Sequence, residues 1–414
     1  MINLSFCDRY SYHPKIKEQF ARILSVIDIS KVRSVLLYGS ASMGEIASRL
    51  SDGEVELYSD YEFIIVARGL VSKQYGKKLS EHFAELEKVF SNNPLFKLDF
   101  SYVSARFLRK RWKRTTAVDL SKAVVVFGED LRHLMPAFNM DNLHKKLHNE
   151  ILLWALWRNI LFFPVEILHN KTVSEEKHSW YNYILCKNCL QIPLWLLPLE
   201  GVSRPSYREM IDYIAKHYHA LGASHFFDEA FTQVLNECYM GKTKLEFRNN
   251  STELYRQVVR YCLAAKRYLL SLHGRPADDL FSNSRGIFFI DNYSLRVIYD
   301  IYLLISKTDH LDLIKSFRWL SSSKYGLMMD FLFDMNLALL CYLDCRCKES
   351  EEHSSLAYER LTKLILSKSL CMADEMALFP DRWVFLRDRF SAFLSMYIPS
   401  LRLFNNKVLK MNSL

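Results

Sequence analysis

The feature that most constrains the fold is a change of hydrophobic pattern about one third of the way along the 414 residues. Before residue 136, short apolar runs alternate with segments of helical spacing, whereas helical spacing prevails after it. We interpret the short runs as buried strands, at residues 32–38, 61–67, 96–103 and 123–127. This order predicts an α+β protein, in which a small mixed-sheet domain precedes a large all-helical region.

Helices are expected between these strands and throughout the rest of the chain. In the first part, apolar spacing predicts helices at residues 15–29 and 74–90, and a further helix at 41–50. Beyond residue 136, segments with helical periodicity recur as far as residue 397. A turn-rich stretch at 274–286 interrupts them. The sequence therefore predicts three regions, at residues 1–136, 137–280 and 281–414.

The composition indicates which cellular compartment and which classes of partner suit this chain. The formal net charge of +9 favours anionic partners such as nucleotides, nucleic acid, acidic glycans or lipid headgroups. Nine cysteines without a secreted-framework spacing are typical of a reducing compartment, and the first residues do not form a signal peptide pattern. The most apolar segment, 151–168, contains charged residues and a proline, so a buried helix is expected there. We expect a cytoplasmic protein without a membrane span.

The first motif is a glycine-serine turn between a strand and a predicted helix. The run 32–38 stops at Gly39 and Ser40, and the sequence continues as Ala-Ser-Met-Gly. Glycine permits close approach of a ligand to the backbone, and Ser40 with nearby N–H groups would hold phosphate oxygens at a helix start. No Gly-Lys-Ser/Thr follows, so the turn is not a P-loop.

The second motif is a set of acidic residues on two predicted strands. Asp60 and Glu62 are two residues apart, so their side chains share one face of a strand. Asp99 lies on the next predicted strand and joins them if the two strands are neighbours. Clustered carboxylates repel one another unless cations neutralise them, and divalent cations with oxygen ligands suit this task. The sequence therefore predicts a Mg²⁺ site, which Mn²⁺ would also occupy.

Together the two motifs resemble the polymerase-beta-like nucleotidyltransferase superfamily. The resemblance covers about residues 30–135 and lies in LLYGSASMGE, YSDYEFIIV and FKLDFSYV. The chain is most similar to bacterial aminoglycoside-type and related stand-alone enzymes, which carry a helical C-terminal domain. Two features depart from the pattern, because the segment between Ser40 and Asp60 is long and the second acidic residue is Glu62 rather than aspartate.

The resemblance implies a reaction and a role for each residue. The first region would be catalytic, and the helical region 137–280 would face the acceptor and the nucleotide. Gly39 and Ser40 would contact the triphosphate, with Lys187 as a further nucleotide ligand. The carboxylates of Asp60, Glu62 and Asp99 would be catalytic and bind metal, Asp99 serving as ligand or as base. The implied activity is Mg²⁺-dependent transfer of AMP from ATP, or of another NMP from its NTP, to a hydroxyl of a small or sugar-like acceptor, with release of pyrophosphate.

Two alternatives remain open from the sequence. The dense basic run from Arg106 to Arg114 has Phe107 and Trp112 interleaved, which would suit RNA as the acceptor. A protein side chain or a second nucleotide would also fit this first alternative. The second alternative is a catalytically inactive binding or scaffold protein that keeps the fold. The sequence does not specify the oligomeric state.

Overall fold

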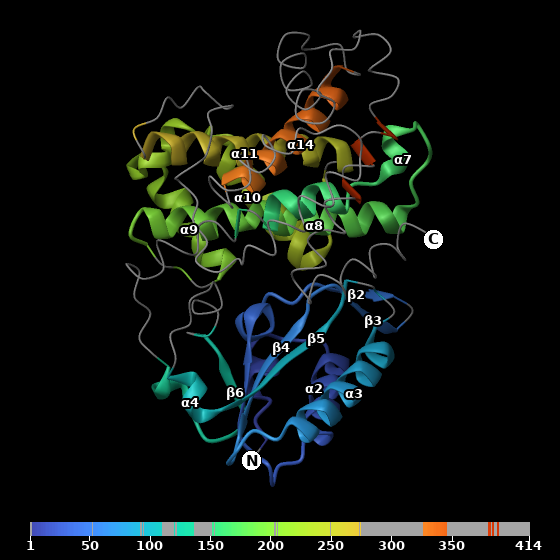
Figure 1. The fold of residues 1–414 in the computed structure, drawn as a ribbon, viewed down its shortest axis with the longest axis vertical. Helices are drawn as coiled ribbons and strands as arrows, with labels where there is room; N and C mark the ends of the chain where they lie inside the picture. Colours follow the sequence, from blue (N-terminus) through green and yellow to red (C-terminus); the bar gives the residue numbers. More distant parts are fainter. Residues whose placement is uncertain are drawn as a thin grey trace, which may run out of the picture. The chain divides into compact units, whose positions relative to one another are not determined.

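A computed structural model gives the fold of the chain as α+β (Figure 1). The structure describes residues 2–51, 53–91, 93, 95–109, 120, 122–135, 151–152, 154–202, 204, 206–248, 250–272, 274, 326–345, 380–381, 383–384 and 387–388. The chain divides into two compact units. The first unit comprises Met1–Leu147, Leu197–Lys216 and Tyr239–Glu246, and the second comprises His148–Leu196, His217–Cys238 and Phe247–Leu414.

A four-stranded mixed sheet is the centre of the first unit. Its strands are β1 (Val32–Tyr38), β4 (Tyr61–Ala67), β5 (Leu98–Ser104) and β6 (Val124–Gly128). They lie in the order β5-β4-β1-β6, in which β4 and β5 run parallel and the other pairs antiparallel. The small mixed sheet that the sequence predicts is confirmed, and β1 and β4 span the predicted residues.

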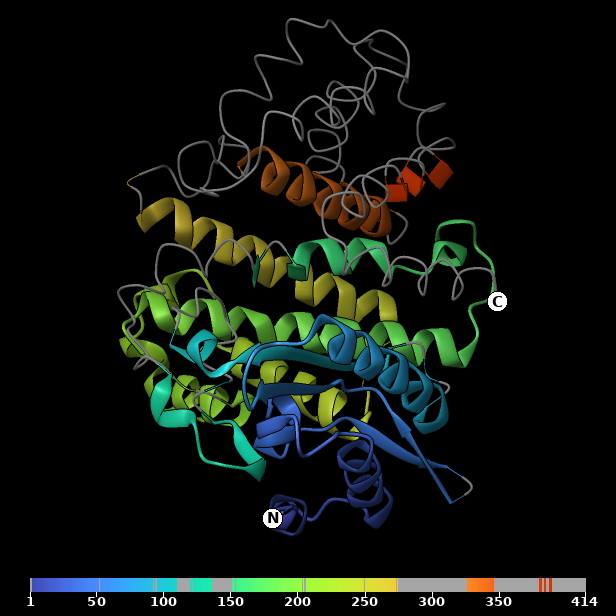
Figure 2. The same cartoon turned by 60° about the horizontal axis from the view of Figure 1, so that its bottom comes forward.

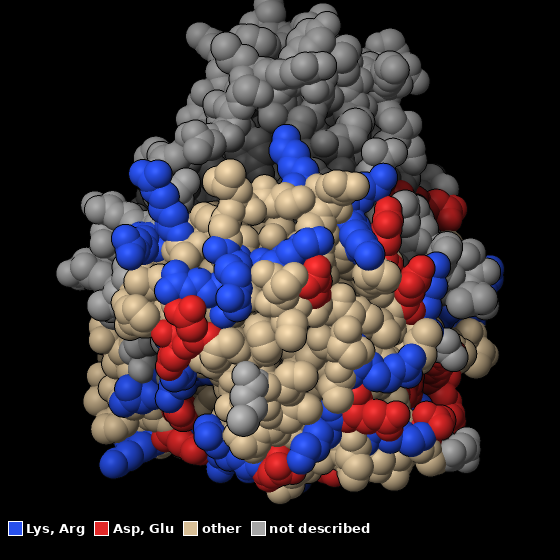
Figure 3. All heavy atoms as spheres, turned by 90° about the horizontal axis from the view of Figure 1, so that it is seen from below, with Lys and Arg blue, Asp and Glu red and all other residues tan. Residues whose placement is uncertain are grey.

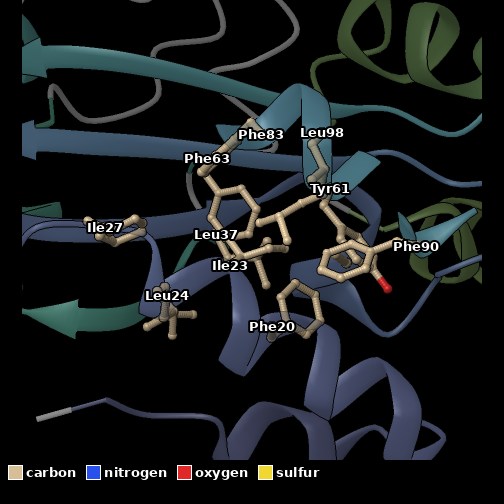
Figure 4. Close-up of a cluster of buried hydrophobic side chains, with 14 of the residues drawn as sticks. Phe20, Ile23, Leu24, Ile27, Leu37, Tyr61, Phe63, Phe83, Phe90 and Leu98 are labelled. Carbon is tan, nitrogen blue, oxygen red and sulfur yellow. The ribbon is translucent and has the colours of Figure 1, made fainter. Parts of the chain in front are cut away.

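Two helices cover one face of this sheet. They are α2 (Pro14–Ser25) and α3 (Lys73–Phe90), and Figures 1 and 2 show both on the same side. Parallel strands need a long crossover connection, which the 18 residues of α3 supply between β4 and β5. The apolar faces of both helices pack on alternate residues of the strands. Figure 4 shows this core, to which Phe20, Tyr61, Phe63, Phe83 and Phe90 contribute aromatic rings.

The opposite face of the sheet carries a second, smaller apolar cluster. Leu36 on β1 and both Ile64 and Val66 on β4 point to this side, because strand side chains alternate. Short segments pack on them, among them α4 (Ala105–Leu108) and the residues flanking β6. By the same alternation, Glu62 belongs to this second face, near the start of β4.

The prediction of a helix at residues 41–50 is wrong. The chain instead forms a 3-10 turn, η1 (Gly39–Met43), and then a separate hairpin of β2 (Ser48–Ser51) and β3 (Glu54–Leu57). Gly44 adopts a left-handed conformation with φ of 80°, which ends the turn. Ser59 then holds the chain in its new direction, because its hydroxyl accepts a hydrogen bond from the Ala47 N–H at 2.7 Å.

The remaining elements are helical, and the described residues beyond Met135 include no strand. Further α-helices among the described residues are α1 (Ser5–Arg9), α7 (Val165–Leu168), α8 (Glu175–Leu199), α9 (Tyr207–His217), α10 (Ala230–Lys244), α11 (Ser251–Leu272) and α14 (Gly326–Cys345). The predicted region boundaries after residues 136 and 280 lie outside the described residues. No described helix has the length and apolar character that crossing a membrane requires.

Within the second unit, α11 packs against α14. The Tyr255 hydroxyl donates to the main-chain oxygen of Asn336 at 3.1 Å, and both residues are buried. The Asn336 amide in turn donates to the main-chain oxygens of Leu332 and Leu156. Buried polar groups that are satisfied in this way fix the register of neighbouring helices.

Candidate functional site

The site begins at the turn that follows β1. Gly39 has φ of 70°, a left-handed conformation that residues with a Cβ atom adopt at a cost. Inside the turn, the buried hydroxyl of Ser42 donates to the main-chain oxygen of Gly39 at 2.9 Å. The Tyr12 hydroxyl donates to the main-chain oxygen of Ala41 at 2.9 Å from outside it. Side chains from inside and outside the turn therefore add to its backbone hydrogen bonds.

The side chain of Glu62 lies directly against Gly39. In the antiparallel pair β1–β4, Tyr38 is the partner of Glu62, which places the start of the turn beside this carboxylate. A Cβ atom added to Gly39 would lie 1.9 Å from Oε2 of Glu62. Position 39 therefore needs glycine for two reasons, its backbone conformation and the space that Glu62 occupies.

Asp99 lies on the strand next to Glu62. The two residues are direct partners in the parallel pair β4–β5. On β5, Leu98 and Phe100 pack on the helix-covered face of the sheet, so Asp99 between them points to the opposite face, as Glu62 does. The sequence left the adjacency of these two strands open, and the sheet order establishes it.

Asp60 completes the acidic set at the entry to β4. It is half-buried and lies two positions before Glu62, which is also half-buried. The side chain of Asp99 is 53% exposed, and Lys97 pairs with it at 3.0 Å. The acidic set thus runs from a partly enclosed pair to an exposed carboxylate that already has a cationic neighbour.

These carboxylates supply the oxygen donors that Mg²⁺ prefers. Among the described side chains, no three of the types His, Cys, Asp and Glu come close enough together to hold a metal ion. Mg²⁺ is usually bound by one or two carboxylates together with substrate phosphates and water, rather than by a cage made only of protein. The metal-binding role of the acidic set therefore stays a prediction.

The surroundings of Ser40 differ from the expected helix start. Ser40 is half-buried in the five-residue 3-10 turn, and its main-chain oxygen accepts from the N–H groups of Gly44 and Glu45. The dipole of a long helix therefore does not act here, and a phosphate would be held by the turn itself. Lys187 lies half-buried on α8, in the second unit, and its role as a nucleotide ligand stays a prediction.

The predicted basic run is described only in part. Arg106 and Arg109 are exposed, and Phe107 beside them is 38% exposed. Lys110, Arg111, Trp112, Lys113 and Arg114 lie outside the described residues. On the face shown in Figure 3, described basic and acidic side chains are interspersed rather than separated by sign.

The sequence analysis did not predict the buried ionisable pair Glu45 and Lys242, which lies next to the end of the turn. Glu45 and Lys242 are 2% and 1% exposed, and the Lys242 ammonium donates to the main-chain oxygen of Glu45. Glu45 follows Gly44 directly, so the turn motif itself gave a signal for it. Lys242 had no such signal, because 197 positions separate it from Glu45.

Comparison with models of known protein families and with curated proteins gives no match for this chain. The resemblance to the nucleotidyltransferase superfamily therefore rests on the motifs themselves.

Proposed function

We propose that this chain is a nucleotidyltransferase that transfers an NMP, with AMP the expected group, from an NTP to a hydroxyl of a small or sugar-like acceptor. The observation that supports this most is the register of the sheet, in which Glu62 is the partner of Asp99 on one side and of Tyr38, next to Gly39, on the other. A glycine-serine turn and carboxylates from two strands thereby share one end of one sheet face. Groups that would hold phosphate and groups that would hold metal would then lie together, as this chemistry requires.

The reaction assigns each group a task. The acceptor oxygen forms a bond to the α-phosphorus, the bond from that phosphorus to the leaving pyrophosphate oxygen breaks, and the acceptor proton passes to Asp99 or to solvent. Gly39 and Ser40 would bind the triphosphate through backbone and hydroxyl groups. Asp60 and Glu62 would hold Mg²⁺, which when bound neutralises phosphate charge.

Burial suits this division of tasks. Half-buried Asp60 and Glu62 are shielded from bulk water, which strengthens their interaction with a cation. Asp99 is more exposed, so an acceptor hydroxyl has a route to it from solvent. Lys97, 3.0 Å from Asp99, places a positive charge beside this carboxylate.

The direct test is label transfer by the full chain. Wild-type protein is incubated with each of the four α-labelled NTPs, with Mg²⁺ or Mn²⁺, and with a cell extract as the source of acceptors. We expect pyrophosphate release and a labelled product with at least one nucleotide. Asp60→Asn should abolish both, whereas Glu18→Gln, which neutralises an exposed acid on α2, should not. Folded wild-type protein that transfers no label from any nucleotide would support the binding or scaffold alternative instead.

A further inference from the structure

The buried ionisable residues Glu45 and Lys242 lie next to the end of the Gly39–Gly44 turn and have no role in the reaction described above. Glu45 and Lys242 both belong to the first unit. The Lys242 ammonium donates to the main-chain oxygen of Glu45 and lies over the ring of Tyr207, 5.5 Å from its centroid. A buried ammonium is costly unless such groups stabilise it, so this arrangement requires a specific compensation.

The carboxylate of Glu45 meets the start of α9. Its Oε1 accepts from the Arg208 N–H at 3.1 Å, and the Tyr207 N–H donates to the same carboxylate. An anion is favoured at the positive end of this 11-residue helix. Burial raises the pKa of the Glu45 carboxyl, while the Lys242 charge and the two N–H groups oppose that rise.

The same residue is bonded to the turn. The Glu45 N–H donates to the main-chain oxygen of Ser40 at 2.9 Å. One residue therefore connects Ser40 to α9 through its carboxylate and to the end of α10 through its carbonyl. A short 3-10 turn has little stability of its own, so contacts from outside it decide its geometry.

We propose that Glu45 and Lys242 are positioning residues that hold the Gly39–Gly44 turn in the conformation that binds nucleotide. This inference rests on the proposed function. Neither side chain touches the reacting atoms, and each acts through the backbone of the turn. This role would also explain why the segments Leu197–Lys216 and Tyr239–Glu246 belong to the first unit, because they bring α9 and Lys242 to the unit that carries the acidic set.

The test uses full-length variants and two readouts. Lys242→Met removes the ammonium, and Lys244→Met removes an exposed ammonium two residues further along α10 as the matched control. Glu45→Ala removes the acceptor for the α9 N–H groups, and Glu45→Gln keeps an acceptor oxygen. The first readout is hydrogen exchange of the peptide that spans Gly39–Ala47, compared with peptides from α3. The second is the Kd of ATP with Mg²⁺.

We expect turn exchange about tenfold faster and ATP binding about tenfold weaker in Lys242→Met and Glu45→Ala, which corresponds to about 1.4 kcal/mol. Lys244→Met should match wild type, Glu45→Gln should recover part of the loss, and exchange in α3 should not change. At saturating ATP, turnover should recover in these variants, but not in Asp60→Asn. If Lys242→Met does not fold, the comparison of Glu45→Ala with Glu45→Gln decides the question.

The outcomes separate the two proposals. Unchanged turn exchange, or unchanged Kd in variants of a wild-type protein that does bind ATP, overturns the positioning role alone. A folded wild-type protein that binds none of the four NTPs overturns the proposed function and, with it, the nucleotide role of the pair.

Discussion

Glu62 lies opposite Asp99 in a parallel strand pair, although 37 positions of sequence, including all of α3, separate the two residues. The crossover brings them to one sheet face, and the antiparallel β1 brings Gly39 to the other side of Glu62. The candidate site is thus a consequence of strand order, since no single segment of the chain contains it.

Replacement of Gly39 by alanine should disturb both the fold and the site. The left-handed backbone costs about 1–2 kcal/mol with a Cβ atom, and Glu62 must move because its Oε2 would lie 1.9 Å from that atom. Urea unfolding should show at least this loss, and label transfer should fall with it. Gly69→Ala is the control, because a Cβ atom there meets nothing within 4 Å. Equal stability of both variants would refute the assigned contact.

Asp130 should make stability depend on acid pH. Hydrogen bonds from the Arg132 guanidinium lower the pKa of the Asp130 carboxyl from 3.8 to about 2. Because the folded pKa is the lower one, the ionised carboxylate stabilises the fold above about pH 4, and this contribution is lost as the pH falls toward 2. Urea unfolding of wild type and Asp130→Asn should differ by a constant amount between about pH 5 and 7, and the difference should shrink below about pH 4. A difference that grows on acidification would contradict this.

Five buried cysteines should resist alkylation in the folded protein. Burial raises the pKa of the Cys7 thiol to about 11, and this side chain is only 1% exposed. Four further cysteines are also free and buried, namely Cys186, Cys189, Cys238 and Cys262. Few thiolates form at Cys7 near pH 8, and burial blocks reagent access at all five positions, so iodoacetamide should label them only after denaturation. Rapid labelling of Cys7 in folded protein, detected by peptide mass spectrometry, would show that the N-terminal core opens.

The exposed arginines after β5 distinguish a small acceptor from RNA. With a small acceptor, the double variant Arg106→Gln/Arg109→Gln should keep nucleotidyl transfer within about threefold of Arg9→Gln/Lys78→Gln, which loses the same charge at exposed sites elsewhere. If RNA is the acceptor, the affinity of the double variant for RNA should be lower than that of wild type. The slope of log K against log salt should then decrease in magnitude by about one for each lost phosphate contact. Filter binding at several salt concentrations measures that slope.

Local patterns predicted much of the sheet and its helices. The alternating and apolar runs identified β1 and β4 to the residue, and helical spacing placed α3 within one residue of its start. The prediction of a helix at 41–50 was wrong because apolar spacing does not reveal how Gly44 and the Ser59 hydroxyl redirect the chain. An Asp-Gly pair at 52–53 was the available signal for the hairpin that replaces the helix.

The candidate site was predictable only where its residues are close in sequence. Spacing of two predicted a common side for Asp60 and Glu62, whereas the position of Asp99 depended on β5 pairing with β4. The contact between Glu45 and Lys242 had no local pattern at all, because tertiary packing alone joins residues 197 positions apart.

Asp60, Glu62 and the glycine-serine turn should bind a divalent cation together with a nucleotide. Electron paramagnetic resonance of Mn²⁺, titrated into the full chain with a non-hydrolysable ATP analogue, measures this directly. We predict that wild type binds Mn²⁺ tightly only when the analogue is present, and that Asp60→Asn and Glu62→Gln each lose this binding while Glu18→Gln keeps it. Equal Mn²⁺ binding by wild type and both site variants, with the analogue present, would contradict metal binding by these two carboxylates.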